Sequence, residues 1–296
     1  MTSSRLLIVG LGYTGLAVAC LALGEGFEVA ATTRSPHPRR VPGVRMLPFG
    51  AAGAEIAAAT HLFSTAPPPG DGAKGEGVDP VLDAYGAAIA AAPALRWAGY
   101  CSSTAVYGHH GGGWVDETTE PAPTQERGRR RLAAERAWAS LSGRIAVDLL
   151  RIAGIYGPGR SVLDDLRDGR GRRIVRPGQM FSRIHRDDIA RATLAAVRQE
   201  RAPCVRVLNL ADDEPAESAA VAEEAARLLG VDPPPAVPYA EIESSLGPMA
   251  RSFWQENRRV SSAATKAALG ITWHYPSYRE GLRAILATEI EDSATD

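Results

Sequence analysis

The chain has 296 residues, enough for roughly two structural units around a large buried core. Its 33 Lys and Arg residues nearly balance 34 Asp and Glu residues, so no basic field indicates nucleic acid or an anionic membrane as a partner. The three cysteines and six histidines show neither a disulfide framework nor metal-ligand spacing, which predicts a reducing, cytoplasmic setting and no metal site. The uncharged stretch 6–23 lacks a preceding positive cluster and a following cleavage signal, so no membrane anchor is predicted.

An apolar run, Leu6–Val9, meets three glycines spaced G-x-G-x-x-G and continues into an Ala- and Leu-rich helical pattern. In this spacing Gly10 permits a tight strand-to-helix turn, and Gly12 lets a pyrophosphate approach the backbone. Gly15 lets the helix lie close to the strand, so that its first N–H groups face the phosphates. The stretch predicts a dinucleotide site. Its predicted cofactor contacts are Gly10, Gly12, Tyr13, Thr14 and Gly15.

The second predicted strand, 26–34, ends where an NAD site usually places a carboxylate on the adenosine ribose. Here Thr33 stands at the strand end and Arg34 follows. A hydroxyl beside a guanidinium suits the 2′-phosphate of NADP, so NADP is predicted ahead of NAD. The alternative is that Arg34 belongs, with Arg39 and Arg40, to a solvated loop.

The chain then alternates strand and helix patterns, which predicts an α/β fold built on a doubly wound parallel sheet. Strands are expected at 44–49, 61–66, 95–102, 145–151 and 205–210, and helices at 81–92, 129–141 and 161–167. Thr65 and Ala66 end a strand where a cofactor could lie alongside. The Pro- and Gly-rich segment 67–80 predicts a loop at the carboxyl edge of the sheet, with a lid as one reading.

The later part of the chain predicts a smaller, mostly helical region. Phe181, Arg183 and His185 share one face of a short strand, and Asp187 is expected to cap the helix 189–199. Two helices, 217–229 and one from 278 onward, flank a Pro-rich link at 233–238. The predicted domains are a cofactor-binding unit of 1–155 with about 186–211, and a substrate-binding region of about 156–185 with 212–296.

Hydroxyl groups gather in the segment 100–108, at the carboxyl end of a central strand, where ligands bind in sheets of this type. Ser103 or Thr104 could hydrogen-bond a substrate hydroxyl or carbonyl. The alternative is a strand-end turn whose hydroxyls only cap the backbone.

With the glycine motif before it and Arg151-x-x-x-x-Tyr156-Gly157-Pro158-Gly159 after it, this segment resembles the NAD-dependent epimerase/dehydratase family of extended short-chain dehydrogenases/reductases. The resemblance covers nearly the whole chain, including 184–190 and 208–211. It implies that Ser103 carries the catalytic hydroxyl and that the Tyr156 to Pro158 segment lies by the nicotinamide. The further cofactor contacts predicted are Thr33, Arg34, Thr65, Ala66, Ser102, Arg131, Tyr156, Gly157 and Pro158.

The chain departs from the family at the proton donor, which is a Tyr followed four residues later by a Lys. Aligned through 132–135, this chain has Arg127 and Arg131 at those positions, and no Tyr occurs between Tyr107 and Tyr156. Arginine stays protonated and is a poor general acid near neutral pH. Arg131 could still bind the cofactor ribose, and Arg127 could clamp an anion or polarise a carbonyl.

A surface salt-bridge ladder is the alternative for these arginines, because Arg127, Arg131 and Glu135 are spaced by four residues. If catalysis still requires a tyrosine as proton donor, Tyr107 and Tyr156 are the candidates. A substrate-side cluster suited to phosphate or carboxylate is expected from Arg160, Arg183 and His185. Further candidates for that cleft are Trp254, Asn257 and Arg258.

Together these features predict an NADP(H)-dependent oxidoreductase, epimerase or dehydratase that acts on a small polar substrate, either sugar-like or anionic. The predicted catalytic residues are Ser103, Arg127 and Tyr107. A non-catalytic NADP(H)-binding sensor or regulatory protein is the alternative function. The sequence leaves the oligomeric state open, with a homodimer as one option.

Overall fold

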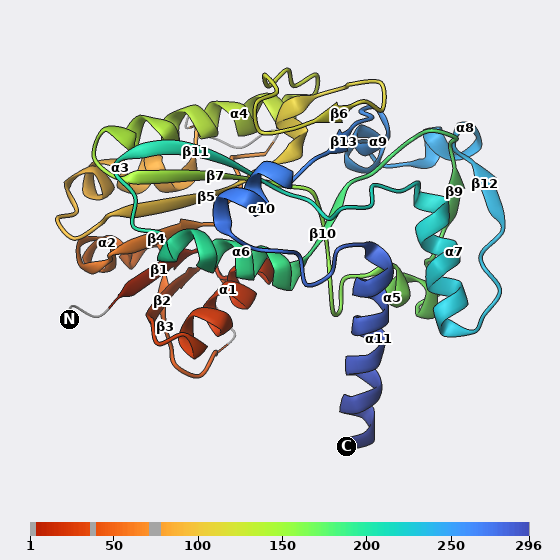
Figure 1. The fold of residues 1–296 in the computed structure, drawn as a ribbon, viewed down its shortest axis with the longest axis horizontal. Helices are drawn as coiled ribbons and strands as arrows, with labels where there is room; N and C mark the ends of the chain where they lie inside the picture. Colours follow the sequence, from red (N-terminus) through yellow and green to blue (C-terminus); the bar gives the residue numbers. More distant parts are fainter. Residues whose placement is uncertain (1–3, 36–39, 71–77, 296) are drawn as a thin grey trace.

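The computed structural model describes residues 4–35, 40–70 and 78–295, and its centre is a parallel β-sheet (Figure 1). The seven strands of this sheet are β1 (Arg5–Val9), β2 (Glu28–Thr33), β3 (Val44–Pro48), β4 (His61–Ser64), β5 (Trp97–Ser103), β7 (Ala146–Ile152) and β11 (Cys204–Leu210). Their spatial order is β11, β7, β5, β4, β1, β2, β3, and every neighbouring pair is parallel. The chain therefore winds outward from β1 in both directions, which confirms the predicted doubly wound α/β fold.

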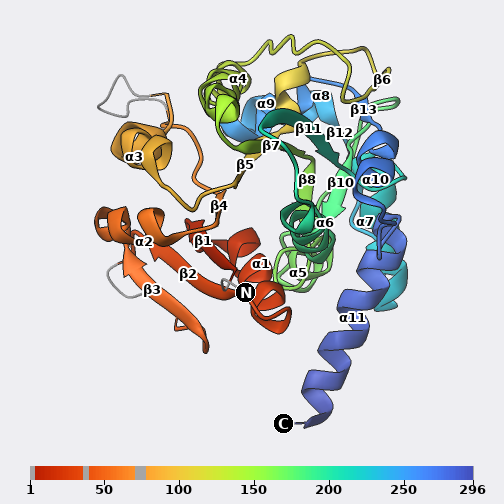
Figure 2. The ribbon, with the colours of Figure 1, turned by 60° about the vertical axis from the view of Figure 1, so that its left-hand side comes forward.

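Helices cover both faces of the sheet (Figure 2). One face carries α1 (Tyr13–Gly24), α6 (Arg186–Arg198) and α10 (Ala263–Leu269), and the other carries α2 (Gly53–Ala58), α3 (Pro80–Ala91) and α4 (Glu126–Ala139). Alternate residues of β1 enter opposite cores, because Leu6 and Ile8 belong to one hydrophobic cluster and Leu7 and Val9 to the other. This double burial explains why the first strand is apolar at consecutive positions.

A smaller region lies beyond the carboxyl ends of the strands, with a hydrophobic cluster of its own. Its helices are α5 (Val162–Arg167), α7 (Ser218–Leu229), α8 (Tyr239–Ile242), α9 (Pro248–Trp254) and α11 (Tyr278–Thr295). Its short strands are β6 (Trp114–Val115), β8 (Gly154–Tyr156), β9 (Arg173–Val175), β10 (Arg183–His185), β12 (Ala236–Pro238) and β13 (Arg259–Val260). They form three parallel pairs, β8 with β10, β9 with β12 and β6 with β13. Each pair joins segments that are far apart in the chain.

The structure corrects the predicted start of α6. The helix begins at Arg186, and its N-cap is His185, whose Nδ1 accepts a hydrogen bond from the Asp187 N–H at 3.2 Å. The expected cap, Asp187, lies instead within the first turn. A histidine ring nitrogen is an acceptor when unprotonated, so it can replace the carboxylate that the sequence rule favours.

Two other expectations differ from the structure. The Pro-rich link 233–238 contributes the short strand β12, and α4 starts three residues before the predicted helix. Residues 71–77 of the expected lid lie outside the described ranges. Within those ranges, no helix combines the length and apolarity that crossing a bilayer requires.

Candidate functional site

The glycine motif forms a tight turn at the carboxyl end of β1. Gly10 has φ +100°, and its N–H donates to the Thr32 hydroxyl at 3.1 Å. A Cβ placed on Gly15 would lie 2.7 Å from the Gly10 carbonyl oxygen, so only glycine permits this helix-to-turn distance. A Cβ on Gly12 would meet no atom within 4 Å. The turn is therefore close-packed at Gly15 and open at Gly12, as the approach of a pyrophosphate requires.

Side chains from two other segments meet this turn. Thr65, after β4, donates its hydroxyl to the Gly10 carbonyl oxygen. Tyr13 donates its hydroxyl to the Pro158 carbonyl oxygen at 3.0 Å, and a Cβ on Gly157 would lie 2.6 Å from the Tyr13 hydroxyl. The structure thus brings the predicted nicotinamide-side loop onto the glycine motif. We call Gly10 to Gly15, together with these contacts, the cradle.

The other predicted cofactor residues lie close to the cradle. Thr14 is buried in the first turn of α1, and Ala66 packs against a hydrophobic core. At the end of β2, the Thr33 hydroxyl accepts from the Ser35 N–H at 3.0 Å, and Arg34 is exposed.

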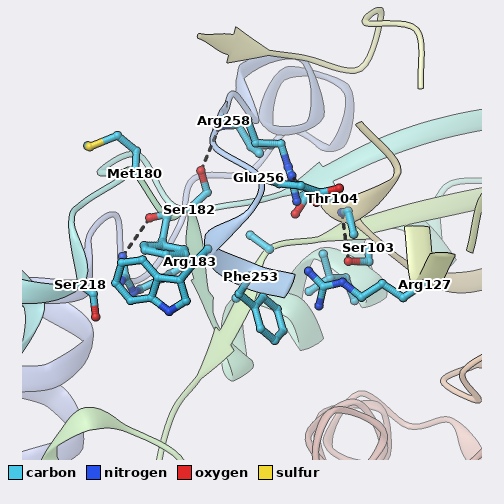
Figure 3. A pocket seen from close by; sticks show the side chains of 17 residues that line it. Ser103, Thr104, Arg127, Met180, Ser182, Arg183, Ser218, Phe253, Glu256 and Arg258 are labelled. Atoms are coloured by element: carbon cyan, nitrogen blue, oxygen red, sulfur yellow. Dashed lines mark hydrogen bonds and ion pairs between the residues drawn. The ribbon is translucent and has the colours of Figure 1, made fainter. Parts of the chain in front are cut away.

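A cavity of about 310 Å³ opens at the carboxyl ends of β5 and β7 (Figure 3). In the sheet, only β4 separates β5 from β1, so the cavity and the cradle share one edge. The polar side chains that carry its chemistry are Ser103, Thr104, Arg127, Arg183, Glu256 and Arg258. Its aromatic side chains are Phe181, Phe253 and Trp254.

Arg127 reaches the cavity because α4 lies unusually close to the turn after β5. A Cβ on the next residue, Gly128, would lie 2.7 Å from the Ala105 carbonyl oxygen. The Arg127 guanidinium stacks over the Phe253 ring with 3.9 Å between its carbon and the ring centroid. Burial lowers the pKa of Arg127, and the nearby carboxylate of Glu256 opposes that fall.

The contacts of Arg131 and Glu135 differ from the salt-bridge ladder that was the alternative for α4. Arg131 donates from Nη1 to the Cys101 carbonyl oxygen at 2.7 Å and to the Tyr100 hydroxyl at 3.1 Å. Glu135 pairs instead with Arg151, through contacts of 3.0 and 2.8 Å. These arginines therefore face the sheet and the cavity rather than a solvated ladder.

Two hydroxyls that follow one another in the chain have different surroundings. The Ser103 hydroxyl lines the cavity and accepts from the Ala105 N–H at 3.2 Å. Ser102 is buried and donates its hydroxyl to Glu135. Successive residues of a strand point to opposite faces, which separates the two.

Neither candidate tyrosine lines the cavity that holds Ser103. Tyr107 is fully buried, and its hydroxyl donates to Asn209 Oδ1 at 2.7 Å. Tyr156 donates to the Ser277 carbonyl oxygen at 3.3 Å. Burial raises the pKa of both phenols, so neither is poised to release a proton near neutral pH.

The three residues of the expected substrate-side cluster do not line a single cavity. Arg183 lines the first cavity and also a second one of about 370 Å³, where Arg160 joins it. Arg160 also lies over the Tyr13 ring, 5.6 Å from its centroid. His185 is 1% exposed and lines neither cavity, and burial lowers its pKa to about 4.

Among the later candidates, Trp254 and Arg258 line the first cavity and Asn257 does not. Asn257 bonds the Gly178 carbonyl oxygen and the Met180 N–H instead, at 2.8 and 3.0 Å. Sequence reasoning missed Phe253 and Glu256, which adjoin these candidates in the chain. In the described part of the chain, no group of three or more His, Cys, Asp or Glu residues is arranged to hold a metal ion.

No protein-family model matches the chain. A structure of a conserved protein of unknown function from Silicibacter pomeroyi DSS is 40% identical, with a TM-score of 0.86 over 97% of this chain and 99% of that one. An NAD-dependent epimerase/dehydratase, so assigned by similarity, from Methylobacillus flagellatus is 26% identical over 98% and 100% of the two chains, with a TM-score of 0.72. The human epimerase family protein SDR39U1, solved with NADPH, is 21% identical over 96% and 99%, with a TM-score of 0.73.

One curated relative is a 3-diazoavenalumate denitrifying reductase from a Streptomyces species. It is 32% identical over 161 residues, which are 51% of this chain and 51% of that protein. The chain therefore matches about half the length of this relative. With the cradle and the parallel sheet in place, the chain shares the Rossmann-like fold of its solved structural neighbours, which include NAD-dependent epimerase/dehydratase family proteins.

Proposed function

We propose that the chain is an NADP(H)-dependent oxidoreductase of the epimerase or dehydratase type, acting on a small polar substrate that is sugar-like or anionic. The observation that carries the proposal is the cavity beside the cradle, which is lined by Ser103, Arg127 and Arg258. Residues 1–155 with about 186–211 would hold the cofactor, and about 156–185 with 212–296 would form the substrate-binding region.

The cradle fits a dinucleotide because Gly12 is open and Gly15 is closely packed. When bound, a nicotinamide cofactor supplies hydride exchange with a substrate carbon. Arg34 is exposed beside Thr33 and would pair with a 2′-phosphate, which favours NADP over NAD.

Ser103 and Arg127 have separate roles in the proposal. Because the Ser103 oxygen accepts from the Ala105 N–H, its own proton remains available to donate to a substrate oxygen. Arg127 stays charged, so it binds an anionic group or stabilises negative charge that develops on the substrate. It does not replace the family's tyrosine as an acid, and the active site is non-standard in this respect.

Titration of NADPH and NADH into the wild-type chain tests the cofactor assignment. Arg34→Ala should weaken NADPH binding about tenfold and leave NADH binding unchanged, since one charge-assisted pair is lost. Equal affinity of the wild-type chain for NADPH and NADH would refute the role of Arg34.

Catalysis is tested by following NADPH oxidation with a panel of carbonyl compounds and nucleotide sugars. Ser103→Ala should lower turnover at least tenfold if the hydroxyl acts directly. Unchanged turnover would remove Ser103 from the mechanism.

A sensor that binds NADP(H) without chemistry is the second candidate, favoured by Arg127 and Arg131 at the family's Tyr and Lys positions. Under this alternative, NADPH binds tightly and no compound in the panel is reduced.

A further inference from the structure

Two guanidinium groups in the cavity have buried donors without partners. Arg127 Nε is buried with no hydrogen-bond partner, and within the described ranges its guanidinium forms no hydrogen bond or ion pair. Arg258 Nε is also buried and unpartnered, although its Nη1 donates to the Gly108 carbonyl oxygen at 2.8 Å and to Glu256 at 2.9 Å. A buried donor left unpaired is destabilising, so both arginines are suited to an acceptor that a ligand would bring.

The charge of the cavity defines that acceptor, because three arginines, Arg127, Arg183 and Arg258, line it. Of these, Arg183 already donates to two backbone carbonyl oxygens. Glu256 is the one carboxylate among the described lining residues, and both of its oxygens are already occupied. They accept from the Thr124 hydroxyl at 2.8 Å and from Arg258 at 2.9 Å. Arg127 therefore has no carboxylate of its own. A ligand with one negative charge would complete its environment.

The shape of the cavity wall defines the rest of the ligand. Phe253 lies under the Arg127 guanidinium, and Figure 3 shows these two side chains next to each other. Phe181 and Trp254 meet edge to face, with centroids 5.0 Å apart. Trp254 also stacks on Tyr239, with ring centroids 4.9 Å apart, which holds this part of the wall in place. The three rings give the cavity an apolar aromatic wall next to the arginines, which suits an aromatic ligand.

We propose that this cavity binds a planar carboxylate, meaning an aromatic or conjugated acid, with the carboxylate on Arg127 and the flat body against Phe253 and Trp254. The inference rests on the proposed function, because it takes this cavity as the substrate pocket. It narrows the substrate class from small polar compounds to one chemical type. A cavity of about 310 Å³ lies at the small end of the range for ligand pockets, which also favours a single-ring acid over a nucleotide sugar.

Calorimetric titration of the wild-type chain, with and without saturating NADP⁺, tests the inference directly. The probes are benzoate and trans-cinnamate, against cyclohexanecarboxylate as a non-planar acid, benzamide as a planar neutral compound, and UDP-glucose. The two planar acids should bind at least tenfold more tightly than cyclohexanecarboxylate and benzamide. This comparison requires no variant and therefore does not depend on the folding of one.

Two variants then test whether the carboxylate of the ligand binds at Arg127. Arg127→Gln should weaken benzoate binding at least tenfold, since a charge-assisted hydrogen bond is lost. Phe253→Leu should weaken it several-fold. The matched control is Arg136→Gln, an exposed arginine on the same helix α4 and outside the cavity, which should leave benzoate binding unchanged.

Three results would overturn the inference: equal affinity for planar and non-planar acids, no loss in Arg127→Gln, or tighter binding of UDP-glucose than of either planar acid. Each of these leaves the proposed cofactor and reaction class standing. Failure of the wild-type chain to bind NADP⁺ or NADPH would instead refute the proposed function. The titrations without cofactor would then still decide whether the cavity takes planar acids.

Discussion

Glu135 and Arg151 form a buried ion pair between α4 and β7, and Glu135→Gln should lower the free energy of unfolding far more than an ordinary surface substitution does. Their side chains are 3% and 5% exposed, and two nitrogen–oxygen contacts of 3.0 and 2.8 Å join them. Removing one partner of a buried pair leaves the other charge uncompensated, which costs about 3–5 kcal/mol. For a chain of this size, that loss corresponds to a fall in Tm of roughly 10 °C.

Urea unfolding followed by circular dichroism measures this loss. Glu126→Gln is the matched control, because Glu126 is on the same helix, 56% exposed and paired with Arg129 and Arg130 near the surface, so its loss should stay within about 1 kcal/mol. The double variant Glu135→Gln/Arg151→Met removes the stranded charge and should recover most of the lost stability. If Glu135→Gln were no less stable than Glu126→Gln, the buried pair would not hold α4 to the sheet as argued.

Two further predictions concern packing and pH. Gly128→Ala should lower the free energy of unfolding by about 1–3 kcal/mol and weaken ligand binding at Arg127, because the new Cβ would lie 2.7 Å from the Ala105 carbonyl oxygen. Helix propensity alone would make this variant more stable than the wild type, and that result would contradict the close contact. Burial lowers the pKa of His61 and of His185 to about 4, so both stay neutral in the folded chain while the unfolded chain takes up protons below about pH 6.5. The stability they contribute is present above that pH and is lost as the pH falls towards 4, by about 1 kcal/mol each between pH 6 and pH 5. Urea midpoints across this range should fall more steeply for the wild type than for His61→Asn/His185→Asn, and equal slopes would exclude these histidines as the cause.

The sheet and the cradle could be predicted from the sequence because their signals are local. The three glycines of the motif stand within six residues of one another, between an apolar strand and a helix. The strands that follow are buried on both faces and therefore read as apolar runs. These strands and the glycine motif can be recognised without knowing which distant residues they contact.

The cavity wall could not be predicted in the same way. Phe253 and Glu256 reach the cavity of Ser103 through contacts between distant segments, such as the pairing of β13 with β6, and strands of two residues carry no periodic signal. The contrast between Arg127 and Arg131 also depends on tertiary contacts. The close approach of Gly128 brings Arg127 into the cavity, whereas Arg131 is bonded to the end of β5.

The pairing of β6 with β13 also has a consequence for the order in which the chain assembles. It joins Trp114–Val115 to Arg259–Val260, so the cavity wall cannot close until nearly the whole chain has been synthesised. The strands around the cradle, β1, β2 and β4, all lie within the first 64 residues. Because closing a long loop is entropically slower than pairing nearby strands, the strands that carry the glycine motif should pair before the wall of the Ser103 cavity forms.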